Sequence, residues 1–114
     1  MQWVSLENSA QLSQLRSISE ELPCLIFKHS TQCSISALAK KRLEDRWDFA
    51  AEEVRPYYLD LLAHRELSNQ IAEVFATPHA SPQVLLIRSN YCTYDADGLD
   101  ISVQELRECF HDNW

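Results

Sequence analysis

Segments with the apolar spacing of helices alternate with short apolar runs along this chain of 114 residues. In the helical segments, apolar side chains recur every three or four positions. These segments span residues 9–22, 35–47, 65–75 and 102–110. Strands are expected at residues 24–27, 57–62, 83–87 and 91–94. The alternation predicts one α/β domain over residues 1–114, in which helices pack on a sheet.

Turn and capping residues define how these segments connect. Residues 24–27 are apolar throughout, as in a strand buried on both faces. Ser89 and Asn90 suit a tight hairpin turn, whereas Ser102 can cap the last helix with Glu105 as its capping-box partner. The order is helix–strand–helix–strand–helix–strand–strand–helix. A βαβ unit followed by a hairpin and a helix is the thioredoxin-like fold, here a four-stranded mixed sheet flanked by helices, with one helix added in front.

Cys33 lies where the first predicted strand gives way to a helix, and there it faces the positive end of the helix dipole. That position favours the thiolate, which is the nucleophilic form of cysteine. The residue three positions on is Ser36 and not a second cysteine, so the pattern is C-x-x-S. The sequence therefore predicts a redox-active site in which a single cysteine carries out thiol–disulfide exchange.

Several polar side chains around Cys33 are candidates for supporting its thiolate. They are Lys28, His29, Thr31, Ser34 and Ser36. Nearby positive charge and hydroxyl hydrogen bonds both favour an anionic sulfur. Lys28 and His29 are equally consistent with a solvated strand end, and Ser36 with an ordinary residue of the first helical turn. The residues alone leave these alternatives open.

The other three cysteines are not expected to pair with Cys33. Cys24 begins the strand that Cys33 follows, so the strand alone separates them by on the order of 15 Å, whereas a disulfide allows Cα atoms at most ~7 Å apart. Cys92 follows the hairpin turn, and Cys109 lies late in the last helix, both toward the opposite end of the sheet. We expect all three to be small core residues, so that an external thiol must release whatever binds to Cys33.

Ser81 and Pro82 stand where the third core strand begins, which is the place of a cis-proline in this topology. The ordinary alternative is a trans proline at the first residue of a strand. Because Cys33 occupies the matching place in the first core strand, a cis bond is favoured. It would turn the backbone of Ser81 toward the sulfur, where an incoming thiol substrate could pair with it like an added strand. We also expect Pro82 to lie in van der Waals contact with the Cys33 sulfur.

Charge and composition exclude several classes of function. With 10 basic and 17 acidic residues the net charge is −7, and no separate cluster of Lys and Arg predicts nucleic-acid binding. No basic leader precedes an apolar stretch at the N-terminus, and no apolar run is long enough to predict membrane insertion, so we expect a cytoplasmic protein. No cysteine pair has zinc-site spacing, and adding the histidines, such as His29 near Cys33, completes no set of ligands, so no metal site is predicted.

The chain resembles the monothiol bacilliredoxins, thioredoxin-fold proteins of the bacillithiol redox system. The resemblance rests on four pieces: residues 28–31 with Cys33, Ile35 and Ser36; residues 57–59; Arg65 with residues 67–69 and 71–72; and His79 with residues 81–83. It implies that Cys33 removes bacillithiol from S-thiolated client proteins, with bacillithiol as co-substrate and no bound cofactor. It also implies a cis-proline loop whose substrate-binding residues are His79, Ser81, Pro82 and Gln83.

Two positions depart from the pattern of that family. Ser34 stands where the family usually has a proline directly after the cysteine, and proline is favoured at the first position of a helix. Ala80 stands where the family often has an acidic residue beside the substrate loop. Neither change removes the nucleophile, but both bear on substrate preference and rate.

Three other functions fit parts of the same sequence. A C-x-x-S protein could bind an iron–sulfur cluster between two subunits, as monothiol glutaredoxins do, although this chain lacks the glycine pair usual in such sites. A non-catalytic interaction domain would leave Cys33 with ordinary thiol reactivity. A peroxidase is suggested by Ser30 three residues before Cys33, but Ile26 stands where peroxiredoxins have a proline.

Overall fold

The structure is a computed structural model that describes the backbone of residues 1–112 and the side chains of residues 1–110. Its centre is a five-stranded mixed sheet with the strand order β1-β3-β2-β4-β5. The strands are β1 (Val4–Ser5), β2 (Cys24–His29), β3 (Arg55–Asp60), β4 (Gln83–Arg88) and β5 (Tyr91–Asp97). The helices are α1 (Ser9–Ile18), α2 (Ser34–Arg46), α3 (Arg65–Val74) and α4 (Val103–Asp112), with a 3-10 turn η1 (Gly98–Asp100) before α4.

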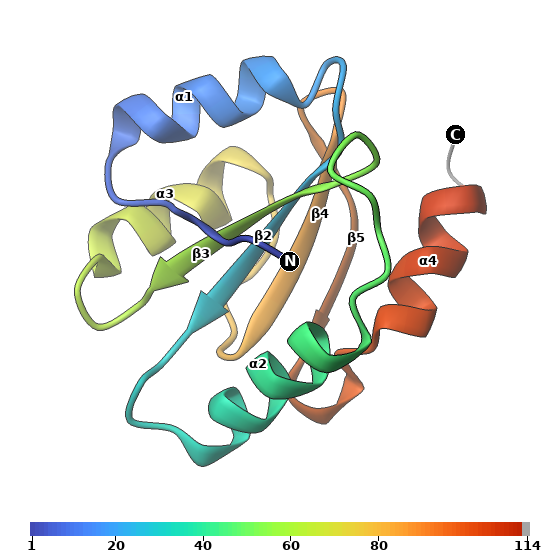
Figure 1. The fold of residues 1–114 in the computed structure, drawn as a ribbon. Helices are drawn as coiled ribbons and strands as arrows, with labels where there is room; N and C mark the ends of the chain where they lie inside the picture. Colours follow the sequence, from blue (N-terminus) through green and yellow to red (C-terminus); the bar gives the residue numbers. More distant parts are fainter. Residues whose placement is uncertain (113–114) are drawn as a thin grey trace.

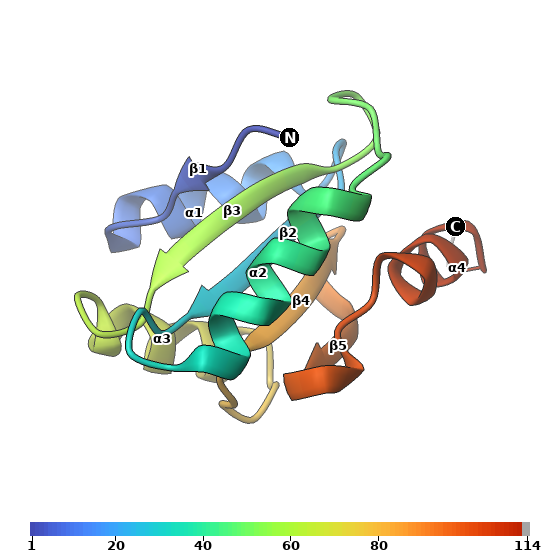
Figure 2. The same cartoon turned by 60° about the horizontal axis from the view of Figure 1, so that its bottom comes forward.

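Helices cover both faces of the sheet (Figures 1 and 2). On one face, Leu12 and Leu15 of α1 and Ile71 of α3 pack against the sheet in one apolar cluster. On the other face, α2 and α4 pack against the sheet in a second cluster that includes Leu43 and Leu106. The side chains of β2 alternate between the two clusters, because successive residues of a strand point to opposite faces. In this three-layer arrangement β2 is the central strand, and its C-terminal end leads into the loop before α2.

The fully apolar run at the start of β2 is buried as the sequence predicts, since β2 has a neighbour on each side. It pairs in parallel with β3 and antiparallel with β4. All six residues of β2 are buried, including the polar Lys28 and His29 at its end. The solvated strand end, one of the two alternatives for these residues, is therefore excluded.

The predicted element order is confirmed, but the predicted number of strands is one too low. The additional strand, β1, pairs in parallel with β3 at the edge of the sheet, with Val4 opposite Tyr57. Both of its residues are exposed, so no alternation of apolar and polar residues marks it. Trp3, just before it, stacks on Phe27 with 5.6 Å between ring centroids, and this contact fixes the strand against the sheet.

The inner face of α2 also differs from the expected one. Ile35 and Leu38, which the spacing places on the core face, are 45% and 41% exposed. The buried residues of α2 are Ser36, Ala39 and Leu43. Small side chains at Ser36 and Ala39 let the start of the helix lie close to β2, and this turns the larger neighbours outward.

The predicted turn and cap are confirmed. Ser89 and Asn90 both have positive φ, 48° and 69°, as a two-residue hairpin turn between antiparallel strands requires. The Glu105 backbone N–H donates to the Ser102 hydroxyl at 3.2 Å, so Ser102 caps α4. The Glu105 carboxylate accepts a hydrogen bond from the Tyr94 hydroxyl and not from the Ser102 backbone N–H, so the capping-box role expected of Glu105 is not found.

Candidate active site

Cys33 is the N-cap residue of α2, with an extended backbone (φ −115°, ψ 121°). Its N–H donates to the Ser30 carbonyl at 3.2 Å, and its carbonyl accepts from the Ala37 N–H at 3.1 Å. The side chain is half-buried and makes no capping hydrogen bond. The first N–H groups of a helix need acceptors, and a thiolate at the N-cap position is close to them and to the positive end of the dipole. Thr31 and Ser34, on either side, are exposed.

Ser36 and His29 form a buried hydrogen-bonded pair beneath the loop that carries Cys33. The Ser36 hydroxyl lies 2.6 Å from His29 Nδ1 and accepts from the Ser30 backbone N–H at 3.1 Å. The His29 ring also packs between Phe27 and Tyr58. Burial, and then the charge of Lys40, lower the pKa of His29, so its neutral form is favoured. Ser36 and His29 therefore hold the loop closed.

Lys28 is fully buried and ties three elements together at the same end of the sheet. Its ammonium donates to the Ser68 carbonyl of α3 at 3.1 Å and lies 3.3 Å from His79 Nδ1 in the loop before β4. Burial lowers the pKa of Lys28 to about 8. The side-chain amide of Gln83 also anchors the loop before β4, since it donates to the Pro78 carbonyl and accepts from the Ala80 N–H.

We expect the stability contributed by Lys28 to depend on pH. Folding lowers its pKa from 10.5 to about 8, so the unfolded state holds more protons between these values and stability rises with pH there. Relative to Lys28→Met, the free energy of unfolding of the wild-type protein should rise by about 2 kcal/mol between pH 7 and pH 10. Urea denaturation of both proteins at several pH values measures this difference. A difference that stays flat across that range contradicts the buried ammonium.

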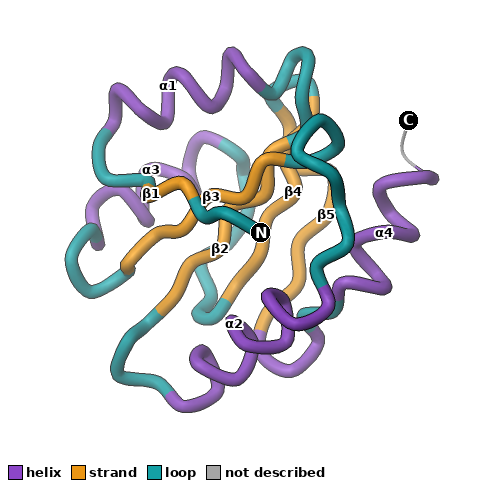
Figure 3. Tube along the Cα trace, viewed as in Figure 1, coloured by secondary structure: helices purple, strands orange, loops and turns teal. Residues whose placement is uncertain are grey.

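The peptide bond between Ser81 and Pro82 is cis, as predicted. Because Lys28 pairs with Gln83, this bond lies at the same end of the sheet as the Cys33 loop, and Figure 3 shows both loops there. Ser81 is exposed, whereas Pro82 and Gln83 are buried. The structure therefore brings the loop with His79 and Ser81 to the Cys33 end of the sheet. Van der Waals contact between Pro82 and the Cys33 sulfur stays a prediction.

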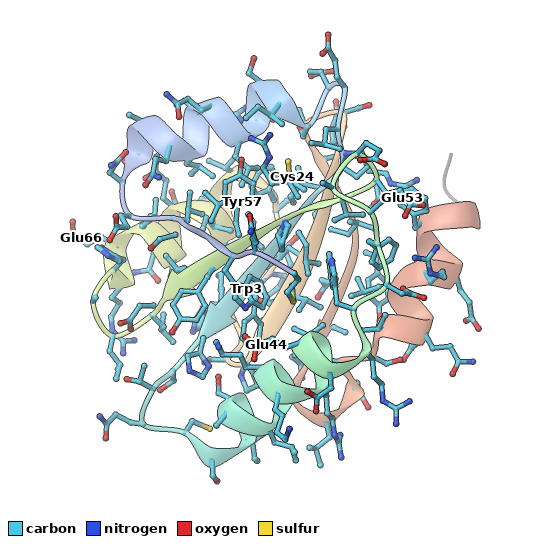
Figure 4. All side chains as sticks on the ribbon, viewed as in Figure 1. Trp3, Cys24, Glu44, Glu53, Tyr57 and Glu66 are labelled. Carbon is cyan, nitrogen blue, oxygen red and sulfur yellow. The ribbon has the colours of Figure 1, made fainter. Side chains whose placement is uncertain are left out.

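Cys24 and Cys92 lie away from this site, and Cys109 is a half-buried residue of α4. All four cysteines are free thiols. Cys24 and Cys92 are both opposite Ile87, and Figure 4 shows Cys24 at the end of β2 remote from the start of α2. Burial raises the pKa of Cys24 to about 12 and also raises the pKa of Cys92, so both stay protonated. They are suited to packing and not to nucleophilic attack.

Ser68 is the residue of this region that the sequence analysis missed. It lies on the buried face of α3 beside Leu67 and Ile71, and its hydroxyl is 3.2 Å from His79 Nδ1. The available signal was a serine within the apolar stripe of a strongly amphipathic helix. Such a buried hydroxyl needs a polar partner, and the loop before β4 supplies it.

The place of Ser34 at the first position of α2 predicts a stabilising substitution. Cys33 already has the extended backbone that a residue before proline prefers, and Ser34 is the first residue of α2. We expect Ser34→Pro to raise the free energy of unfolding by about 0.5–1 kcal/mol, because proline restricts the unfolded chain at a compatible position. Urea denaturation at neutral pH measures the change, and destabilisation would show that the Ser34 backbone N–H is needed.

Comparison with known proteins agrees with this fold. A solved structure of a protein assigned as an oxidoreductase with a thioredoxin fold is 28% identical, with a TM-score of 0.76 over 93% of this chain and 91% of that chain. Thioredoxins from Malassezia sympodialis and Trypanosoma brucei brucei are each 14% identical, with TM-scores of 0.75. They cover 96% and 98% of this chain, and the alignments span 89% and 90% of theirs. The chain thus has the thioredoxin fold.

The family is established by a second comparison. The model of the monothiol bacilliredoxin BrxC family matches residues 4–106. The chain belongs to this family of monothiol bacilliredoxins. Within residues 1–112, no helix is both long and apolar enough to cross a membrane.

Proposed function

We propose that this protein removes bacillithiol from S-thiolated client proteins through Cys33, in the cytoplasm and without a bound cofactor. The observation that carries the proposal is the placement of one half-buried cysteine at the N-cap of α2 while Cys24 and Cys92 lie at the other end of the sheet. A thiolate at that position can attack a disulfide, but no neighbouring cysteine can complete the reaction within the chain.

The reaction then runs in two exchanges. The Cys33 thiolate attacks the bacillithiol sulfur of the client mixed disulfide, and the client cysteine leaves as a thiolate that takes a proton from water. Cys33 is left in a mixed disulfide with bacillithiol. A second bacillithiol, as thiolate, attacks the bacillithiol sulfur of this disulfide, which releases the Cys33 thiolate and forms bacillithiol disulfide. Bacillithiol is therefore a co-substrate.

The residues around Cys33 take distinct parts in this proposal. Lys28, His29 and Ser36 hold the loops in place through the hydrogen bonds described above. Thr31 and Ser34 are exposed and lie within two positions of Cys33 along the chain, and their hydroxyl groups are the expected donors to its thiolate. The backbone of Ser81, next to buried Pro82 and Gln83, is the expected pairing edge for the incoming disulfide.

The test is to incubate the protein with one client carrying bacillithiol and, in parallel, with the same client carrying glutathione. Mass spectrometry should show loss of bacillithiol from the client and a gain of the same mass on Cys33, at a higher rate than for glutathione. Equal rates would contradict the preference for bacillithiol. A brown, iron-containing protein that leaves both clients unchanged would instead support an iron–sulfur function.

A further inference from the structure

The three side chains Lys28, Ser68 and His79 form a hydrogen-bonded cluster at the same end of the sheet as the Cys33 loop. They come from β2, α3 and the loop before β4. Lys28 and Ser68 are fully buried, whereas His79 is exposed. His79 Nδ1 faces the buried pair, 3.3 Å from the Lys28 ammonium and 3.2 Å from the Ser68 hydroxyl. The ring is thus fixed from its inner side.

These contacts determine where His79 carries its proton. A charged lysine has only hydrogen-bond donors, so His79 Nδ1 must accept from Lys28. A neutral imidazole that accepts at Nδ1 carries its hydrogen on Nε2. The cluster therefore holds His79 as the Nε2–H tautomer, with Nδ1 committed to the interior and Nε2–H available as a donor.

The charges around His79 favour an anion as the partner of that donor. The charged groups that act on His79 are Lys28 from β2 and Arg65 from the start of α3, and both are positive. Together with burial they lower the pKa of His79, which keeps the ring neutral. Glu66, the next residue of α3, points outward (Figure 4). This is a locally positive place on a chain with a net charge of −7.

We propose that His79 Nε2–H, held from its inner side by Lys28 and within the positive field of Lys28 and Arg65, forms a subsite for a carboxylate group of the low-molecular-weight thiol. Lys28 and Ser68 are positioning residues that fix the tautomer of His79. This inference rests on the proposed function, since it names the class of thiol that reaches Cys33: one with a carboxylate. The anchoring of the same loop by Gln83 keeps the subsite in place relative to the sheet.

The test compares two synthetic disulfides in single-turnover reactions with Cys33. One is 3,3′-dithiodipropionate, which carries carboxylates, and the other is bis(2-hydroxyethyl) disulfide, which is uncharged. We expect His79→Phe to slow mixed-disulfide formation with the anionic reagent about five- to tenfold, as for loss of one ordinary hydrogen bond at an exposed position, with less than about a twofold change for the neutral one. Lys41→Gln, which removes an exposed charge of α2, is the matched control and should leave the ratio of the two rates unchanged.

Two further variants distinguish the effect of the hydrogen-bond donor from the effect of side-chain volume. His79→Gln places an amide near the position of Nε2 and should keep most of the preference for the anionic reagent, whereas His79→Asn places it near Nδ1 and should lose it. An equal loss of both rates in His79→Phe, or a loss of the preference in Lys41→Gln, overturns the subsite. Neither reagent needs a client protein, so this test is independent of the test of bacillithiol removal. The subsite proposal can be contradicted while bacillithiol removal is observed, and bacillithiol removal can be contradicted while the subsite is observed.

The tautomer is tested without any reaction. Two-bond ¹H–¹⁵N correlation spectra of the wild-type protein should show His79 with its hydrogen on Nε2 and a pKa below that of an ordinary histidine. In Lys28→Met, and more weakly in Ser68→Ala, the two tautomers should mix and the pKa of His79 should rise. A wild-type spectrum with the hydrogen on Nδ1 overturns the assignment even if Lys28→Met does not fold.

Discussion

Replacing Cys33 by serine should abolish the proposed removal of a low-molecular-weight thiol from a client protein. A serine hydroxyl is not ionised at neutral pH and cannot form the mixed disulfide through which the exchange passes. The expected loss is at least about a thousandfold, which corresponds to the uncatalysed reaction and to roughly 4 kcal/mol of lost transition-state stabilisation. Release of the thiol, followed by mass spectrometry of the client, measures it, and circular dichroism checks that the variant is folded.

The matched variant keeps Cys33 and replaces Cys24, Cys92 and Cys109 together by alanine. It should retain exchange whenever an external thiol is present, because Cys24 and Cys92 lie at the opposite end of the sheet and stay protonated. Its free energy of unfolding should fall by about 1–3 kcal/mol, since buried volume is lost at Cys24. If the triple variant folds and yet fails to turn over with an external thiol present, one of these cysteines is needed and the monothiol mechanism is wrong.

Most of the fold could be predicted because the sequence patterns and the tertiary contacts agree. The continuous apolar run at the start of β2 is buried on both faces, and the hairpin at Ser89 and Asn90 has the positive φ values of its turn type. β1 could not be predicted in this way. Its two residues are exposed, and it is fixed by neighbours such as Leu6, which is fully buried, and Trp3, which packs on Phe27.

The sequence predicts the position of the candidate nucleophile, Cys33, but not how the side chains around it are packed. The position of Cys33 follows from local order alone, because a cysteine between a strand and a helix must stand at the helix N-terminus. Whether Lys28 and His29 are solvated depends on what covers the end of β2, and that is set by α3, α2 and the loop before β4. The exposure of Ile35 likewise depends on the closeness of α2 to the sheet.

Replacing Ser36 by alanine should be the most damaging change at the site that leaves Cys33 in place. The Ser36 hydroxyl pairs with His29 Nδ1 and with the Ser30 N–H, and all three groups lie below the loop. Without it, two polar groups lose their partner, each at a cost of about 1–3 kcal/mol, so the free energy of unfolding should fall by about 2–3 kcal/mol after partial rehydration. Urea denaturation measures this loss. Hydrogen exchange at the Ser30 amide should accelerate in parallel, because its acceptor is gone.

Ser34→Ala is the control for this prediction. It makes the same serine-to-alanine change two residues earlier, where the side chain is exposed. Its effect on the free energy of unfolding should stay within about 0.5 kcal/mol. Reaction of Cys33 with a neutral disulfide should slow in Ser36→Ala, because a loosened loop holds the sulfur at the N-cap for a smaller fraction of the time. Equal stability losses in the two variants would mean that the contact between Ser36 and His29 does not hold the loop. A stability loss in Ser36→Ala with unchanged Cys33 reactivity would show that this contact stabilises the fold but does not orient the sulfur. The backbone hydrogen bonds between Ser30, Cys33 and Ala37 would then be what orients it.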